Sequence, residues 1–112
     1  MRLHRLLLTV ALVVSVNTVA RAEFIDGNVL HDECEKDSRF CTAYVMAIAE
    51  TLLREAGIAL PQFRICMPLN TNSKQIRDVV KQVLVSNPAG RTAPANYIVA
   101  NALQQAWPCA SE

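Results

Sequence analysis

Several ingredients of catalytic and metal sites are scarce in this sequence of 112 residues. It contains two histidines and three glycines, and aromatic residues make up 5% of it. It has no C-x-x-C or H-x-x-x-H pair, the spacings typical of zinc sites. A glycine-rich loop that could hold phosphate groups is also missing. These absences predict a non-enzymatic protein that binds neither a metal nor another cofactor.

Long apolar runs are missing too, apart from one at the N-terminus. Arg2 and Arg5 give a basic start, residues 6–19 are mostly apolar, and Ala-Arg-Ala at positions 20–22 forms a small-x-small cleavage pattern. The run is shorter than the roughly 18 apolar residues that a membrane-spanning helix needs. The pattern therefore predicts that residues 1–22 are a secretory signal peptide, and that no membrane anchor remains after processing.

The exported part is predicted to be one small domain of 90 residues, because removal of residues 1–22 from the 112 leaves residues 23–112. Three of the 11 basic residues leave with the signal peptide and all ten acidic ones stay, so its formal charge is −2. It has no run of basic residues, which argues against a nucleic acid or an anionic lipid as the partner.

All four cysteines, Cys34, Cys41, Cys66 and Cys109, lie in the exported part. An oxidising compartment such as the periplasm favours disulfides, so two bridges are expected. A catalytic thiolate would have to escape this pairing and use His31, three residues before Cys34, as its base. The cysteines therefore predict a periplasmic protein with two structural disulfides.

Helical periodicity predicts an all-α bundle of about four helices. The first three are expected at residues 26–35, at 40–56 before Gly57, and from the Asn72 cap to Asn87-Pro88. The fourth is expected from about Pro94 to Pro108. Two prolines in the segment 58–70 predict an extended crossing without a helix.

The order of these elements predicts one pairing of the cysteines. If the extended segment 58–70 returns along the second helix, the fourth helix brings Cys109 to the end of the bundle that holds Cys34. A continuous helix through Cys34 and Cys41 would separate their Cα atoms by roughly 10 Å, beyond the reach of a disulfide. We therefore expect Cys34 to pair with Cys109, and Cys41 to pair with Cys66.

Short motifs along the exported part occur in a characteristic order. They are Gly27-Asn28-x-Leu30-x-x-x-Cys34, Cys41-x-x-Tyr44-Val45, Cys66-x-Pro68, Gln75-Ile76-x-Asp78-Val79-Val80, Asn87-Pro88, and Ala102-Leu103 through Trp107-Pro108-Cys109. This pattern resembles the Rap/Tai family of periplasmic immunity proteins. The resemblance implies a small secreted helical protein that binds and blocks a peptidoglycan amidase injected by a type VI secretion system.

The turn at residues 87–92 is the predicted contact with such an amidase, because a protruding loop can enter a catalytic groove. Asn87, Arg91 and Thr92 are its candidate binding residues, and Arg91 is its one charged side chain. The alternative interpretation of this turn is a plain connection between two helices. The alternative function is that of a small periplasmic stress chaperone or another non-enzymatic exported protein. With either function, the protein could also form a homodimer.

Overall fold

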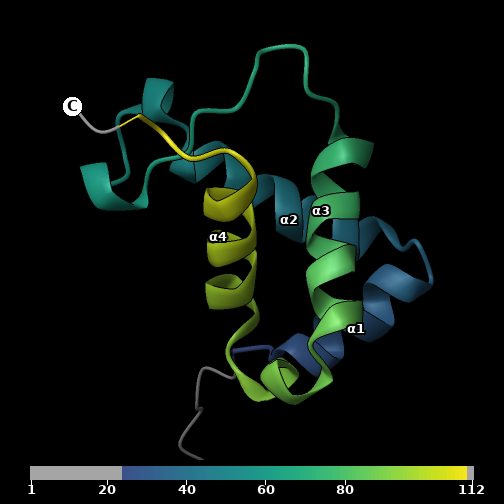
Figure 1. The fold of residues 1–112 in the computed structure, drawn as a ribbon. Coiled ribbons are helices and arrows are strands. Elements are labelled where there is room, and N and C mark those ends of the chain that lie inside the picture. The colour runs from purple at the N-terminus through teal and green to yellow at the C-terminus, as the bar shows by residue number, and fades with distance from the viewer. Residues whose placement is uncertain (1–23, 111–112) are drawn as a thin grey trace, which may run out of the picture.

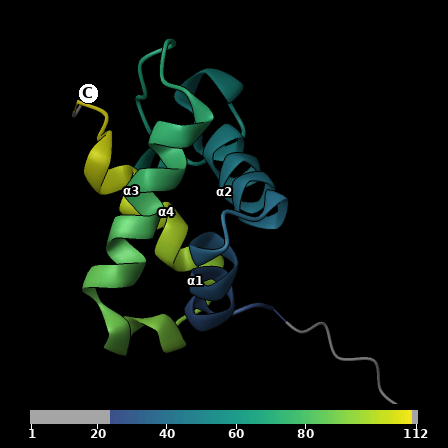
Figure 2. The same cartoon turned by 90° about the vertical axis from the view of Figure 1, so that its right-hand side faces the viewer.

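A computed structural model describes residues 24–110, which form the helical arrangement shown in Figures 1 and 2. Four α-helices are present in this part of the chain: α1 (Gly27–Glu35), α2 (Arg39–Leu52), α3 (Ser73–Ser86) and α4 (Ala95–Ala106). Three short 3₁₀ helices lie between them: η2 (Arg54–Ala56), η3 (Pro61–Phe63) and η4 (Pro88–Thr92). The predicted all-α fold is confirmed. The predicted signal peptide, residues 1–22, lies outside the described residues.

Side chains cap the amino ends of three of these helices. The Asp26 carboxylate accepts a hydrogen bond from an α1 amide at 3.0 Å, and the Ser38 hydroxyl accepts one from an α2 amide at 3.2 Å. At α3, Asn72 and Gln75 bond reciprocally to each other's backbone amides, both at 2.9 Å. This confirms Asn72 as the predicted cap, which forms a capping box together with Gln75. Such caps satisfy amides that have no partner within the helix.

Helix α2 ends earlier than its sequence periodicity predicts. It stops at Leu52 and not near Ala56, because Leu53 adopts extended backbone angles and the chain continues as η2. Gly57 then takes the left-handed conformation, with φ 68°, and ends η2 in place of α2. The connection to α3 therefore starts at the C-terminal end of α2 with a sharp change of direction.

The core lies where the apolar stripes of the helices meet. Helices α3 and α4 are antiparallel, with η4 joining them at the bottom of Figure 1. Each α-helix contributes side chains that are almost fully buried: Leu30, Cys34, Cys41, Val45, Ala49, Ile76, Val80, Leu84, Ala95, Val99, Ala102 and Leu103. Ile65, from the segment between η3 and α3, completes this cluster. Burial of these apolar groups is the main stabilising contribution to the fold.

The predicted disulfide pairing is wrong. Cys34 pairs with Cys41, and Cys66 pairs with Cys109. The chain between α1 and α2 is not a continuous helix, because Asp37 adopts a left-handed backbone with φ 49°. This turn brings the Cα atoms of Cys34 and Cys41 to 5.0 Å, well within disulfide reach.

The second error concerns the direction of the segment 58–70, which does not return along α2. The Ile65 amide donates to the Leu52 carbonyl at 2.9 Å, and the Arg54 amide donates to the Ile65 carbonyl at 3.1 Å. These bonds hold the segment at the C-terminal end of α2, and η3 makes it partly helical. Cys66 therefore stays near the end of α4, where it meets Cys109.

None of the helices within residues 24–110 combines the length and the apolar character that crossing a membrane requires.

Candidate functional site

A groove of about 550 Å³ lies beside the C-terminal ends of α2 and α4. These ends and η3 are found in the upper left part of Figure 1. The lining residues come from η2, η3, α4 and the chain after α4: Arg54, Pro61, Gln62, Arg64, Gln104, Pro108, Cys109 and Ala110. The groove therefore combines elements that are far apart in the sequence.

Backbone hydrogen bonds join the chain segments that carry the lining residues of this groove. Ile65 forms a parallel bridge with Leu53 and an antiparallel bridge with Pro108. The Cys66 amide donates to the Trp107 carbonyl at 3.0 Å, next to the disulfide with Cys109. A covalent bond and two backbone bridges thus join the ends of α2 and α4.

Side chains hold the wall of the groove that η3 forms. The Gln104 Nε2 donates to the Gln62 carbonyl at 2.9 Å, and the Arg64 Nε donates to the Ala59 carbonyl at 2.9 Å. Both bonds join a polar side chain to the backbone of the connecting segment. This wall is therefore ordered before any partner binds, which lowers the entropic cost of binding.

Two arginines give the groove positive charge. Arg54 is half exposed and its Nη2 lies 3.6 Å from Oε1 of Glu55, which is not a lining residue. Within residues 24–110, no carboxylate oxygen lies within 4.0 Å of Arg64. The guanidinium group of Arg64 uses its Nε for Ala59, and its terminal nitrogens have no hydrogen-bond partner in the described part of the chain.

The connecting segment that contributes Pro61, Gln62 and Arg64 to the groove also carries three exposed apolar side chains. Ile58 is 71% exposed, Leu60 is 60% exposed and Phe63 is 49% exposed. Exposed apolar side chains on a segment that also lines a polar groove are compatible with a protein-binding surface. The sequence analysis missed this surface, because it treated residues 58–70 only as a crossing held by Cys66. The signal in the sequence was the combination of apolar residues, prolines and the flanking arginines.

The turn at residues 87–92, the predicted partner contact, is a capped 3₁₀ helix. Asn87 Oδ1 accepts a hydrogen bond from the Gly90 amide at 3.2 Å. Thr92 and Pro88 are exposed, whereas Arg91 is half-buried. The Arg91 Nε donates to the Leu84 carbonyl at 2.6 Å, so this side chain caps the last turn of α3. Asn87 and Arg91 thus have structural roles in this turn.

The turn also packs closely against the amino end of α1. The Gly27 amide donates to the Ala93 carbonyl at 3.0 Å. A Cβ atom at Gly27 would lie 2.8 Å from both Cα and the carbonyl oxygen of Arg91, and it would also overlap the Ile98 side chain. Glycine at position 27 is therefore required for this contact. The turn lies against α1 and does not extend freely from the bundle.

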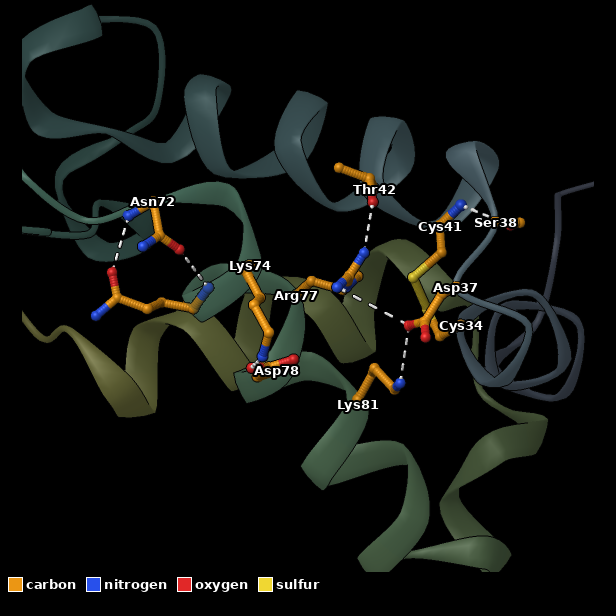
Figure 3. Close-up of polar contacts among 11 residues, drawn as sticks. Cys34, Asp37, Ser38, Cys41, Thr42, Asn72, Lys74, Arg77, Asp78 and Lys81 are labelled. Atoms are coloured by element: carbon orange, nitrogen blue, oxygen red, sulfur yellow. Dashed lines mark hydrogen bonds and ion pairs between the residues drawn. A yellow bond between two sulfur atoms is a disulfide. The ribbon is translucent and has the colours of Figure 1, made fainter.

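A charged cluster joins the corner between α1 and α2 to α3 (Figure 3). Asp37 Oδ1 accepts a hydrogen bond from Lys81 Nζ at 3.1 Å and lies 3.9 Å from Arg77 Nη2. The hydrogen bond and the charge of Lys81, together with the charge of Arg77, lower the pKa of Asp37 below its usual 3.8. Arg77 also donates to the Thr42 hydroxyl at 3.3 Å. The cluster links this corner to α3 through charged and polar side chains.

The side chains considered for catalysis or metal binding are His31, the four cysteines and the carboxylates. His31 Nδ1 lies 3.9 Å from Glu35 Oε1, beyond hydrogen-bond distance. All four cysteines are in disulfides. Among residues 24–110, no group of three or more His, Cys, Asp or Glu side chains could hold a metal ion.

Comparison with known proteins identifies the family of the chain. The model of the Rap1a immunity protein family matches residues 26–109, which include all four helices and both disulfides. The comparisons with curated proteins and with solved structures found no match. Two disulfides, and a family domain that begins after the predicted signal peptide, are consistent with export. Proteins of this family are generally non-enzymatic inhibitors, and membership implies binding to a cognate type VI secretion effector. The chain belongs to the Rap1a immunity protein family.

Proposed function

We propose that this protein acts in the periplasm as a non-enzymatic inhibitor of a peptidoglycan amidase delivered by a type VI secretion system. The family match over residues 26–109 carries this proposal. The two disulfides and the predicted signal peptide support export to the compartment where such an amidase acts. The amidase itself is inferred from the resemblance of the sequence to the Rap/Tai family.

The experiment first searches the genes next to the gene of this protein for a peptidoglycan amidase, and then measures inhibition of that amidase. The exported form, residues 23–112, is added to the purified amidase, and hydrolysis of peptidoglycan is followed. We expect complete inhibition at a 1:1 ratio of protein to amidase, as is typical of a tight complex. Full activity at excess protein would contradict the proposal for this amidase. Broad, pH-dependent suppression of aggregation of unrelated proteins would support the stress chaperone instead.

We also propose that the turn at residues 87–92 contacts the amidase through its exposed surface. Arg91→Ala tests the residue named by the sequence analysis, and loss of a desolvated arginine contact usually weakens binding by roughly 30- to 1000-fold. This variant also loses the hydrogen bond to the Leu84 carbonyl. Its free energy of unfolding must therefore be measured in parallel.

A cleaner test of the turn introduces a long charged side chain at an exposed position. Thr92→Lys leaves the bond between Arg91 and Leu84 in place, and Gln82→Lys on the exposed face of α3 is the matched control. We expect Thr92→Lys to weaken inhibition by at least about tenfold, because the added side chain obstructs a close contact. Equal inhibition by both variants would show that the amidase does not contact this turn.

A further inference from the structure

We propose that the groove between η3 and the end of α4 binds a carboxylate side chain of the effector, with apolar residues beside it. This inference rests on the proposed function and adds a contact separate from the turn at residues 87–92. The two surfaces lie at opposite ends of α4 in Figure 1. The 12 residues of α4 separate them by about 18 Å.

The charges of the lining residues determine the chemistry of the occupant. Arg54 and Arg64 line the groove together with the amides Gln62 and Gln104, and within residues 24–110 no carboxylate side chain lines it. A guanidinium group binds a carboxylate with two parallel hydrogen bonds, and it is always charged. Arg64 is the better donor of the two, because Arg54 already lies near Glu55.

The distribution of acidic residues supports the same assignment. Asp32, Glu33 and Glu35 lie on α1, and in both views of the fold α1 lies at the opposite end of the molecule from the C-terminal end of α4, which lines the groove. The exposed carboxylates Asp32 and Glu35 disfavour an acidic segment of a partner on α1, whereas Arg64, which has no carboxylate within 4.0 Å in residues 24–110, favours one at the groove. Charge complementarity thus selects an acidic occupant at this end of the molecule.

Exposed apolar residues on the segment that lines the groove indicate which side chains of the partner flank its carboxylate. Leu60 and Phe63 are exposed on the same segment as Arg64, before and within η3. Their burial requires a partner with apolar side chains next to its acidic residue. The matching sequence is a short acidic-apolar segment, such as leucine-glutamate-phenylalanine, presented by the effector.

The first experiment tests the groove without the effector. The exported protein, labelled with ¹⁵N, is titrated with acetyl-Leu-Glu-Phe-amide and with the matched peptide that carries glutamine. We expect amide shifts confined to the lining residues, and an affinity about fivefold weaker for the glutamine peptide. Equal affinities, or shifts centred elsewhere, would overturn the proposal.

One other occupant to test is the side-chain carboxylate of the chain's own Glu112. Ala110 lines the groove, and Glu112 follows two residues later, outside the described residues. The titration is therefore repeated with Glu112→Gln. If the glutamate peptide binds only to this variant, the groove holds the carboxylate of the chain itself, and the assignment to a partner is wrong.

The second experiment measures the affinity of the neighbouring amidase for charge-removing variants. The double variant Arg54→Gln/Arg64→Gln should bind about 10- to 100-fold more weakly, whereas Arg39→Gln at the amino end of α2 should bind as the wild type does. Arg64→Lys keeps the charge and loses the Nε donor, so it should retain part of the affinity if charge matters. Thermal unfolding of each variant reports any loss of folding.

The outcomes separate this inference from the proposed function. Full inhibition by wild type together with unchanged affinity of the double variant would refute the groove contact and leave the immunity function in place. Failure of the wild type to bind the amidase would refute the function for that enzyme. The peptide titration would then still decide whether the groove binds carboxylates.

Discussion

Asp37 has two roles. Its backbone forms the turn between α1 and α2, and its carboxylate pairs with Lys81 and Arg77 of α3. Aspartate and asparagine adopt the left-handed backbone, here with φ 49°, more readily than most residues. Asp37→Asn therefore keeps the turn and removes the negative charge that Lys81 and Arg77 face. The variant isolates the electrostatic contribution of this carboxylate to the free energy of unfolding.

The pH dependence of Asp37→Asn follows from the direction of the pKa shift. The pKa of Asp37 in the folded protein is below the usual 3.8, so the carboxylate stabilises the fold above that pH. This contribution is lost as the pH falls through the lowered pKa. The difference in free energy of unfolding between wild type and Asp37→Asn should thus be constant from about pH 5 to 7 and shrink below about pH 4.

Urea unfolding at several pH values measures this difference. Asp32→Asn on the exposed surface of α1 is the control. A difference between wild type and Asp37→Asn that stays unchanged down to about pH 2 would mean that the ion pairs with Lys81 and Arg77 do not contribute to stability.

Gly27 allows α1 to approach η4 closely, because glycine has no Cβ atom. Gly27→Ala places a Cβ atom 2.8 Å from backbone atoms of Arg91, so η4 and α1 must move apart. We expect a loss of about 1 to 3 kcal/mol in free energy of unfolding. Asn28→Ala, at an exposed position of the same helix, should change stability by less than about 0.5 kcal/mol. Similar losses in both variants would show that the tight approach is absent.

At the scale of elements, α3 shows how well an apolar stripe predicts burial. Val80 is fully buried, whereas Val85 on the same helix is 54% exposed. Val80→Ala should lower the free energy of unfolding by about 2 to 4 kcal/mol, and Val85→Ala by less than about 0.5 kcal/mol. Chemical denaturation of the two variants compares the same substitution on two faces. Equal losses would mean that the assigned face of α3 is wrong.

Helix starts and helix faces were predictable from the sequence, because their causes are local. The Asn72 and Gln75 capping box needs only four consecutive residues, and the buried stripe of α3 repeats every three or four. Lys81 shows the limit of this reasoning. The stripe places Lys81 on the polar side, and its ion pair with Asp37 depends on a residue 44 positions away.

The chain path and the site were harder to predict, because both depend on contacts between distant segments. The direction of the segment 58–70 is set by hydrogen bonds from Ile65 to Leu52 and from Cys66 to Trp107. Four cysteines allow three pairings, and the wrong direction expected for the segment 58–70 led to the wrong pairing. The groove needs Arg54, Arg64 and Gln104 on one surface, which the sequence order alone does not reveal.

At the scale of the whole molecule, the two disulfides differ in the length of chain that they close. Their sequence separations are 43 for Cys66–Cys109 and 7 for Cys34–Cys41. Loop-closure entropy assigns about 4 kcal/mol to the longer loop and about 2 kcal/mol to the shorter one. The longer disulfide also joins the segment that carries Arg64 to the chain after α4.

Removal of the longer disulfide should therefore loosen the groove as well as the fold. We expect Cys66→Ala/Cys109→Ala to lose about 4 kcal/mol in free energy of unfolding. The Ile65 and Cys66 amides should exchange with solvent faster, because their bridges lose the adjacent cross-link. Amide hydrogen exchange in Cys34→Ala/Cys41→Ala gives the comparison. Unchanged protection at Ile65 in the first variant would show that the bridges hold without the disulfide.

The same pairing also decides what a protease can release from the molecule. Ile58 and Leu69 are both exposed on the connection between α2 and α3, but only Leu69 lies inside a disulfide-closed ring. A cut beside Leu69 leaves both fragments covalently joined, so the nicked protein migrates as one band until it is reduced. A cut beside Ile58 severs the only covalent path between the two halves, which packing alone then holds together. A single backbone break therefore ends the covalent connection between the two halves at Ile58 but not at Leu69.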